Sequence, residues 1–133
     1  MTAALICSLV GCGAESTQGP DQLSSESTGC EGAISWEEAG SHIGEVVTVE
    51  GPVVSTYFAR ESSGQPTFLN IGRDHPDPDR VTALVWGEDR DRFPHAPEVA
   101  YWGKTICVTG QVDLYEGVAE VIVSSPDEIE VRA

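Results

Sequence analysis

From residue 46 onward, apolar and polar positions alternate in short runs, the pattern of strands that bury one face. In EVVTVEGPVVSTYFA, valines recur at alternate positions and predict one long strand. Gly51-Pro52 interrupts it, and because Gly permits a bend and Pro tolerates only an edge or bulge, we expect this strand to curl midway. Four further segments predict strands: PTFLNIG, RVTALVWG, KTICVTGQVDLY and GVAEVIVSSPDEIEVR.

Two segments break the strand pattern with helical signals. Ser35-Trp36-Glu37-Glu38 has capping-box spacing, with Ser35 as N-cap and Glu38 three residues on, and predicts a short helix to about His42. Gly44 is placed to end it. The polar, Pro-interrupted segment EDRDRFPHAPEVAYWG predicts a loop with a helical turn.

The order of these elements predicts an all-β fold, a five-stranded OB-fold barrel with a short N-terminal helix and a helical turn between strands 3 and 4. The sequence over 34–132 resembles a bacterial family of OB-fold domains. The segments that carry the resemblance are ISWEEAGSHIGEVVTVEGPVVSTY, TFLNIG, GKTICVTGQV and EVIVSSPDEIEV. It implies the fold more specifically than a function, because such domains are called nucleic-acid-binding by similarity alone.

The apolar N-terminus, MTAALICSLVGCG, resembles the lipobox signal of bacterial lipoproteins. In that family a cysteine thiol, here Cys12, receives a lipid whose acyl chains include palmitate, and cleavage makes it the new N-terminus. No Lys or Arg precedes Cys12, which departs from an ordinary signal. We expect a signal peptide over 1–12, a disordered Ser/Gly-rich tether over 13–33 and the OB-fold domain over 34–133. The alternative is a frayed terminus or a first strand.

An extracytoplasmic location changes what the remaining cysteines imply. Without the signal and with Cys12 acylated, Cys30 and Cys107 are left, and two thiols in an oxidising compartment usually pair. Strand alternation places Cys107 on the face opposite Ile106 and Val108, where Cys30 could reach it. We therefore favour a disulfide over two free thiols.

The charge of the chain limits its partners. The sequence has seven basic and 22 acidic residues, which gives a net charge of −15. Because phosphate neutralisation by Lys and Arg dominates nucleic-acid affinity, tight non-specific binding to DNA or RNA is not expected. Five arginines nevertheless gather between positions 60 and 92: Arg60, Arg73, Arg80, Arg90 and Arg92.

The segment RDHPDPDR admits two interpretations. Asp74, Asp77 and Asp79 could supply oxygen ligands for Ca²⁺, but the spacing is not that of an EF-hand. Pro76 and Pro78 should hold the backbone extended and splay the carboxylates. We therefore prefer a stiff, solvated hairpin loop to a metal site, and we expect no cofactor.

Catalytic motifs are missing from the sequence. No Gly-x-Ser-x-Gly occurs, and His42, His75 and His95 are scattered over a helix end and two loops. A Ca²⁺-dependent OB-fold nuclease would need acids and arginines in motifs that this chain lacks. We expect a protein that is not an enzyme.

OB-folds bind ligands on strands 2 and 3 and the adjacent loops, with aromatic rings as stacking platforms. We expect at least one of Phe68 and Trp86 to fill the barrel interior instead. The candidate contact residues in this region are Tyr57, Arg60, Phe68, Asn70, Arg73, Arg80 and Trp86.

These observations predict a lipid-anchored, extracytoplasmic binding module of the bacterial cell envelope. Its partners would be the membrane, through the lipid, and a glycan, a peptide or protein, or single-stranded nucleic acid. The alternatives are an accessory lipoprotein that packs against an envelope complex and, less favoured, the Ca²⁺-dependent nuclease-like enzyme.

Overall fold

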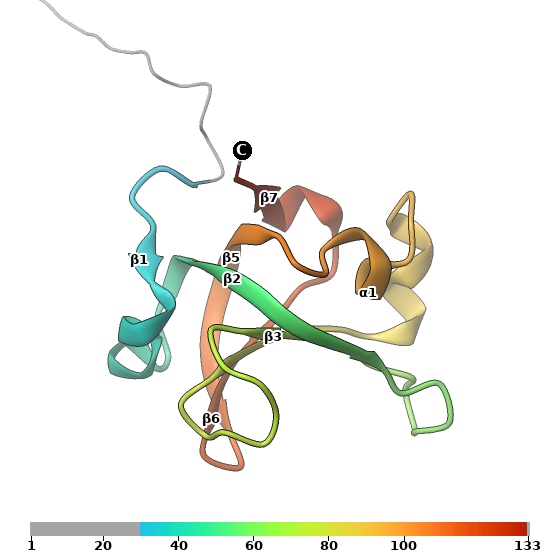
Figure 1. Cartoon of the computed structure of the whole chain (residues 1–133), viewed down its shortest axis with the longest axis horizontal. Coiled ribbons are helices and arrows are strands. Elements are labelled where there is room, and N and C mark those ends of the chain that lie inside the picture. Colours follow the sequence, from blue (N-terminus) through green and yellow to red (C-terminus); the bar gives the residue numbers. More distant parts are fainter. Residues whose placement is uncertain (1–29, 133) are drawn as a thin grey trace, which may run out of the picture.

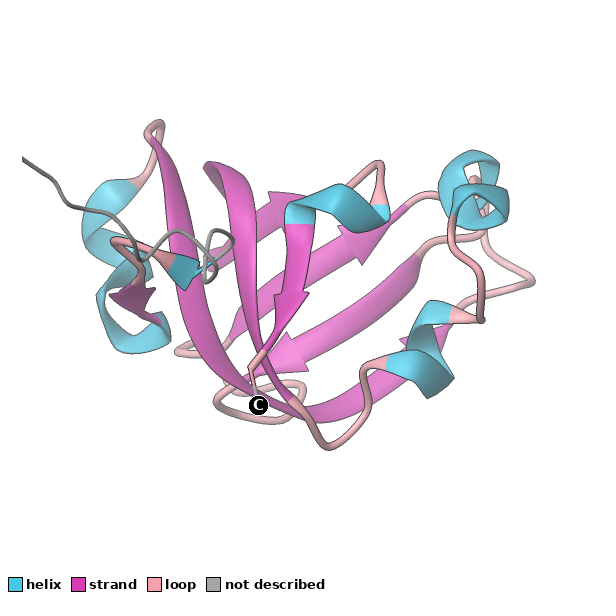
Figure 2. Cartoon of the chain, turned by 90° about the horizontal axis from the view of Figure 1, so that it is seen from above, coloured by secondary structure: helices cyan, strands magenta, loops and turns pink. Residues whose placement is uncertain are grey.

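The structure is a computed structural model that describes residues 30–132. Seven strands dominate it, with short helices between them (Figures 1 and 2). The strands are β1 (Ile34–Ser35), β2 (Val46–Phe58), β3 (Thr67–Ile71), β4 (Val81–Val85), β5 (Thr105–Tyr115), β6 (Val118–Ile122) and β7 (Ile129–Val131).

The five longer strands close into a barrel. Neighbours pair in the order β2–β3–β4–β6–β5, and β5 pairs again with β2. All of these pairings are antiparallel except β4 with β6. The predicted five-stranded OB-fold barrel is therefore confirmed, and β1 and β7 extend it as short additions to β2 and β5.

Strand β2 curls where the sequence predicts. Its first half, through Pro52, pairs with β5, and its second half, from Val53, pairs with β3. The register shifts between Val53 and Ser55, which marks an irregularity of the β-bulge kind. A methyl group on Gly51 would come within 2.5 Å of Ile71 Cγ2, so the bend needs a residue without a side chain.

Aliphatic side chains fill the barrel. On β3, Leu69 and Ile71 point inward and are fully buried, as are Val85 of β4 and Val121 of β6. Neither Phe68 nor Trp86 belongs to this core, so the expectation that one of them fills the interior was wrong. The pleat explains Phe68, since it alternates with Leu69 and must face outward.

The first helix is a 3₁₀ helix, η3 (Trp36–His42). Ser35 is its N-cap as predicted, but Ser35 Oγ accepts from the Glu37 amide and donates to the Glu37 carboxylate, so Glu37 rather than Glu38 completes the cap. The Trp36 ring covers Gly72, whose φ of +84° places it in the left-handed region. This contact fixes the end of β3 against the helix.

The expected helical connection between strands 3 and 4 of the barrel is present between β4 and β5. It consists of a 3₁₀ helix, η4 (Gly87–Arg92), and the short α1 (Pro97–Ala100). Arg90 joins it to the sheet, because its guanidinium lies 3.6 Å from the Phe58 ring centroid and donates to Glu98 at 2.8 Å. A further 3₁₀ turn, η5 (Pro126–Glu128), precedes β7.

The predicted disulfide joins Cys30 to Cys107 across 77 positions of sequence, with Cα atoms 5.3 Å apart. It ties the start of the described chain to the middle of the sheet, and both cysteines are buried. The expected signal peptide and Cys12 lie outside the described residues, as does the expected tether except for 30–33. Within residues 30–132, no helix has the length and apolar character needed to cross a bilayer.

Candidate functional site

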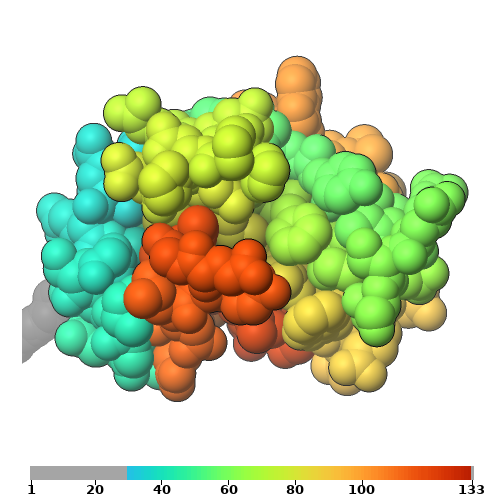
Figure 3. Space-filling view, turned by 90° about the horizontal axis from the view of Figure 1, so that it is seen from below, coloured from blue at the N-terminus to red at the C-terminus, as the bar shows by residue number. Residues whose placement is uncertain are grey.

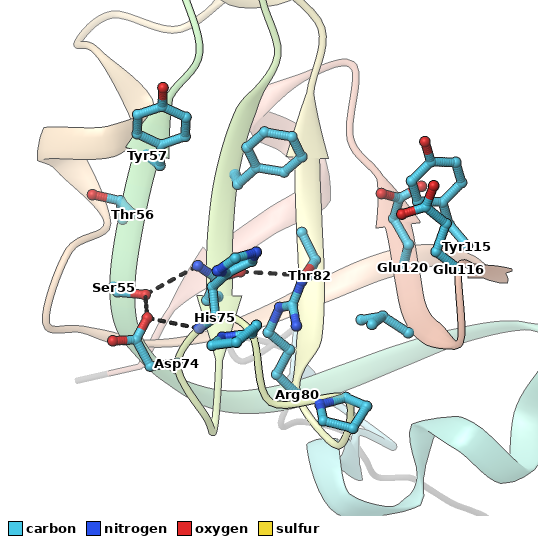
Figure 4. A pocket seen from close by; sticks show the side chains of 15 residues that line it. Ser55, Thr56, Tyr57, Asp74, His75, Arg80, Thr82, Tyr115, Glu116 and Glu120 are labelled. Carbon is cyan, nitrogen blue, oxygen red and sulfur yellow. Dashed lines mark hydrogen bonds between the residues drawn. The ribbon is translucent and has the colours of Figure 1, made fainter.

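A cavity of about 700 Å³ opens on the outer face of the barrel, which we call the outer-face pocket. Its floor is formed by β2, β3 and β4, and its walls by the loop after β3 and the β5–β6 hairpin. Figure 3 shows that loop, coloured yellow-green, next to the orange hairpin, and Figure 4 shows the side chains. The lining residues are Ser55, Thr56, Tyr57, Phe68, Asn70, Asp74, His75, Pro76, Pro78, Arg80, Thr82, Tyr115, Glu116, Val118 and Glu120.

Aromatic rings supply the apolar surface of the pocket. Tyr57 and Phe68 are direct cross-strand partners, and their rings lie 6.4 Å apart between centroids with planes only 6° from parallel. Tyr57 is 62% exposed, so its face is available to a ligand. Tyr115, from the β5–β6 hairpin, stands at the opposite wall (Figure 4). The pocket therefore has flat apolar surfaces on two sides.

A chain of hydrogen bonds crosses the floor from strand to strand. Thr82 donates to Asn70 Oδ1 at 3.3 Å, and Asn70 Nδ2 donates to Ser55 Oγ at 3.0 Å. Ser55 in turn donates to Asp74 Oδ1 at 2.6 Å (Figure 4). The Ser55 hydrogen bond and that from the His75 amide together hold the pKa of Asp74 below its ordinary value. The chain of bonds connects β4, β3 and β2 to the loop.

The loop after β3 is turned rather than extended, contrary to the prediction from its prolines. The Asp77 amide donates to the Asp74 carbonyl at 2.9 Å, and the Arg80 amide to the Asp77 carbonyl at 3.3 Å. These two hydrogen bonds each close a turn, and the His75–Pro76 peptide bond in the same loop is cis. The loop therefore folds back over the sheet and forms a wall of the pocket.

The carboxylates of Asp74 and Asp77 in this loop contact groups of the same protein. Asp77 Oδ1 accepts from the Asp79 amide at 2.9 Å, and its other carboxylate oxygen lies 3.7 Å from Arg73. Asp74 is held by Ser55 and its own following amide. Among residues 30–132, no three His, Cys, Asp or Glu side chains gather in a way that could hold a metal ion.

Ser55, Asp74 and His75 lie together, but their hydrogen bonds are not those of a catalytic triad. In a triad the imidazole stands between hydroxyl and carboxylate and accepts the hydroxyl proton. Here the Ser55 hydroxyl donates directly to Asp74, and His75 contributes its backbone N–H rather than its ring. This arrangement fixes the loop and does not activate the serine.

Charges of both signs line the pocket, and acids outnumber the arginine. Asp74, Glu116 and Glu120 line it together with Arg80. Burial, and secondarily the negative charge of Asp113, raises the pKa of Glu120. Arg80 Nη1 donates to the Asp77 carbonyl at 2.8 Å, which directs that side chain toward the loop.

The structure brings four of the seven candidate contact residues into this pocket: Tyr57, Phe68, Asn70 and Arg80. The other three lie elsewhere. Arg60 is 5.3 Å from the Phe58 ring centroid, and Trp86 lies against Gly64 of the β2–β3 hairpin. Arg73 lines a smaller cavity of about 370 Å³ on the far side of the loop.

Sequence reasoning missed the wall formed by Tyr115, Glu116 and Glu120. These residues lie about fifty positions after β3, and only closure of the barrel places them beside it. The turn at Glu116-Gly117 was a usable signal, since OB-folds bind with the loop between their last two strands as well as with strands 2 and 3. Ser55 gave no such signal, because a lone serine in a strand is ordinary.

No protein-family model and no curated protein matches the sequence. Among solved structures, an aspartyl-tRNA synthetase from Entamoeba histolytica matches with a TM-score of 0.51 and 18% identity over 74% of this chain and 21% of that chain. A putative aspartyl-tRNA synthetase from Leishmania major Friedlin matches with a TM-score of 0.47 and 16% identity, over 74% of this chain and 20% of that chain. The N-terminal domain of PriB from Thermoanaerobacter tencongensis matches with a TM-score of 0.38 and 18% identity, over 66% of this chain and 96% of that chain.

The likeness to the Entamoeba synthetase shows the fold alone. The domain is an OB-fold. This chain spans about a fifth of the length of either synthetase, so its own site must decide what it does.

Proposed function

We propose that this protein is a non-catalytic OB-fold binding module whose ligand occupies the outer-face pocket. One observation carries the proposal: the parallel Tyr57–Phe68 pair borders a cavity of about 700 Å³ on a strand face that OB-folds use for ligands. That volume lies within the range of ordinary small-ligand sites. Flat rings beside polar groups suit a ligand with an apolar face and a few hydrogen-bonding groups.

The arginines favour a glycan or a peptide over an oligonucleotide. All five arginines between 60 and 92 contact groups of the same chain, so they do not form an open basic groove of the kind that tracks a phosphate backbone. The contacts are Arg60 with Phe58, Arg73 with Asp77, Arg80 with the Asp77 carbonyl, Arg90 with Glu98, and Arg92 with Asp89.

A lipid on Cys12 would hold this module at the bacterial cell envelope, outside the cytoplasm. The buried Cys30–Cys107 disulfide supports that location, since such bonds persist in oxidising compartments. Metabolic labelling with an alkyne fatty acid tests it: the native chain should take up the label and Cys12→Ser should not. Equal labelling of both would overturn the anchor.

Calorimetric titration of the full chain tests the binding proposal. The probes are cellotetraose, a lysine-containing tripeptide and oligothymidylate. We expect cellotetraose or the tripeptide to bind more tightly than oligothymidylate, and Tyr57→Ala to weaken that binding about tenfold through loss of ring contact. Trp102→Ala is the matched control, because Trp102 is also 62% exposed but lies outside the pocket. The proposal is overturned if oligothymidylate binds most tightly or if no probe binds. It is also overturned if Tyr57→Ala and Trp102→Ala lose the same affinity.

A further inference from the structure

The side chains that line the outer-face pocket carry more negative than positive charge, which favours a cationic ligand. Three carboxylates line it, and the one arginine beside them has its Nη1 donating to the loop backbone. The same pocket presents three aromatic rings, those of Tyr57, Phe68 and Tyr115. An aromatic face attracts a cation through the negative charge of its π-system, and carboxylates nearby strengthen this attraction.

The negative charge of the Glu120 carboxylate lies in an unfavourable environment. Its side chain is half-buried on β6, where its register partners are Thr82 on one side and Asp113 on the other. Burial and the like charge of Asp113 both disfavour the Glu120 carboxylate, and no hydrogen bond or positive charge within residues 30–132 offsets them. A ligand cation near Glu120 would favour the charged carboxylate by direct attraction and so oppose both effects.

The placement of the rings fits such a ligand. Figure 4 shows Tyr115, Glu116 and Glu120 together at one wall, with Tyr57 across the floor from them. An alkyl chain laid over the rings of Tyr57 and Phe68 would bury apolar surface, while a charge at its end reaches the carboxylate wall. The exposed fractions of Tyr57 (62%) and Tyr115 (60%) leave both rings open to contact.

We propose that the outer-face pocket binds a protonated primary amine carried on an alkyl chain, with the amine at Glu120 and the chain over Tyr57 and Phe68. The inference rests on the proposed binding function and names the chemical class of its ligand. A lysine side chain and a free polyamine both present this group. Neutral sugars lack it.

The test compares amine probes with a neutral counterpart by calorimetry on the full chain. The probes are spermidine, the tripeptide acetyl-Gly-Lys-Gly-amide, and the same tripeptide acetylated on its lysine Nζ. We expect the free amine to bind about tenfold more tightly than the acetylated form, the ratio typical of one charge-assisted hydrogen bond. Spermidine binding above the tripeptide indicates a free polyamine as ligand, and the reverse order indicates a lysine side chain.

The variant pair Glu120→Gln and Glu130→Gln locates the amine. Both glutamates are half-buried strand residues, but Glu130 lies on β7 outside the pocket. Glu120→Gln should weaken amine binding about tenfold, and Glu130→Gln should leave it unchanged. Equal binding of the free and acetylated tripeptides overturns the amine inference while leaving the binding module standing. The binding module itself falls if neither tripeptide, nor spermidine, nor cellotetraose binds.

Discussion

Ser55 on β2 donates a 2.6 Å hydrogen bond to Asp74, a residue 19 positions later in the loop that walls the outer-face pocket. This bond connects the sheet to the loop directly, and Asn70 extends it to β3. Because Asp74 also accepts from the His75 amide, a single carboxylate oxygen organises the first turn of the loop. The shape of the pocket therefore depends on one short contact.

Removing the Ser55 hydroxyl should loosen the loop without unfolding the barrel. In Ser55→Ala, Asp74 keeps the His75 amide but loses its tie to β2, so local opening becomes easier. Hydrogen exchange at the Asp77 amide, which bonds to the Asp74 carbonyl, should accelerate.

Thr48→Val is the control for this exchange measurement. Thr48 forms a 2.7 Å hydroxyl–hydroxyl bond with Thr109, away from the pocket, so its loss should leave Asp77 exchange unchanged. Equal acceleration in both variants would mean that general destabilisation, and not the Ser55–Asp74 contact, controls the loop.

The pH dependence of the loop follows from Asp74. The Ser55 hydroxyl first, and then the His75 amide, lower the pKa of Asp74 below its ordinary 3.8. A group with a depressed folded pKa contributes stability above its unfolded pKa, and that contribution is lost as the pH falls through the folded value. A ¹³C titration of the carboxyl should place its midpoint below 3.8, and Ser55→Ala should raise it. A midpoint at or above the ordinary value in the native chain would contradict this account.

Gly72 should resist substitution more than other left-handed glycines. A methyl group there would overlap the Trp36 ring, in addition to the strain of φ +84°, so Gly72→Ala should cost roughly 3 kcal/mol of unfolding free energy.

Gly103→Ala separates the two effects in the same denaturation experiment. Gly103 has φ +78°, but nothing lies within 4 Å of an added methyl group. This variant should lose only the conformational part, about 1 kcal/mol. Equal losses at the two positions would show that the Trp36 contact does not constrain the end of β3.

The disulfide should make a large contribution to stability. Because it closes a segment of 77 positions, the double variant Cys30→Ser/Cys107→Ser should lose about 4.5 kcal/mol of unfolding free energy on the loop-entropy model. Denaturant titration of the native chain with and without reductant should give a similar difference. A midpoint that reductant does not change would contradict a structural role for the bond.

Much of the barrel was predictable because strand alternation is a strictly local signal. The valines of β2 and the bend at Gly51-Pro52 specify one long curled strand, and the structure confirms it. The outward orientation of Phe68 follows from the same alternation, since Leu69 beside it is buried, and this alternation contradicts the expectation of an aromatic ring in the core.

The site was predictable only where it is local. Tyr57 and Phe68 share a hairpin, so sequence placed both on the ligand face. Glu120 lines the same pocket as these rings only because β4 pairs in parallel with β6. That pairing is a long-range contact that no local pattern encodes. Arg73 was a predicted contact residue, but it lines the smaller cavity on the other side of the loop.

The most direct test of the central claim is an amide chemical-shift map of the full ¹⁵N-labelled chain during titration with cellotetraose and with acetyl-Gly-Lys-Gly-amide. If the outer-face pocket is the binding site, shifts concentrate at Ser55, Phe68 and Glu120, on three different strands, and Tyr57→Ala needs about tenfold more ligand to reach the same shifts. Shifts centred instead on the exposed side chains of Val99 and Trp102, or shifts that persist unchanged in Tyr57→Ala, would contradict it.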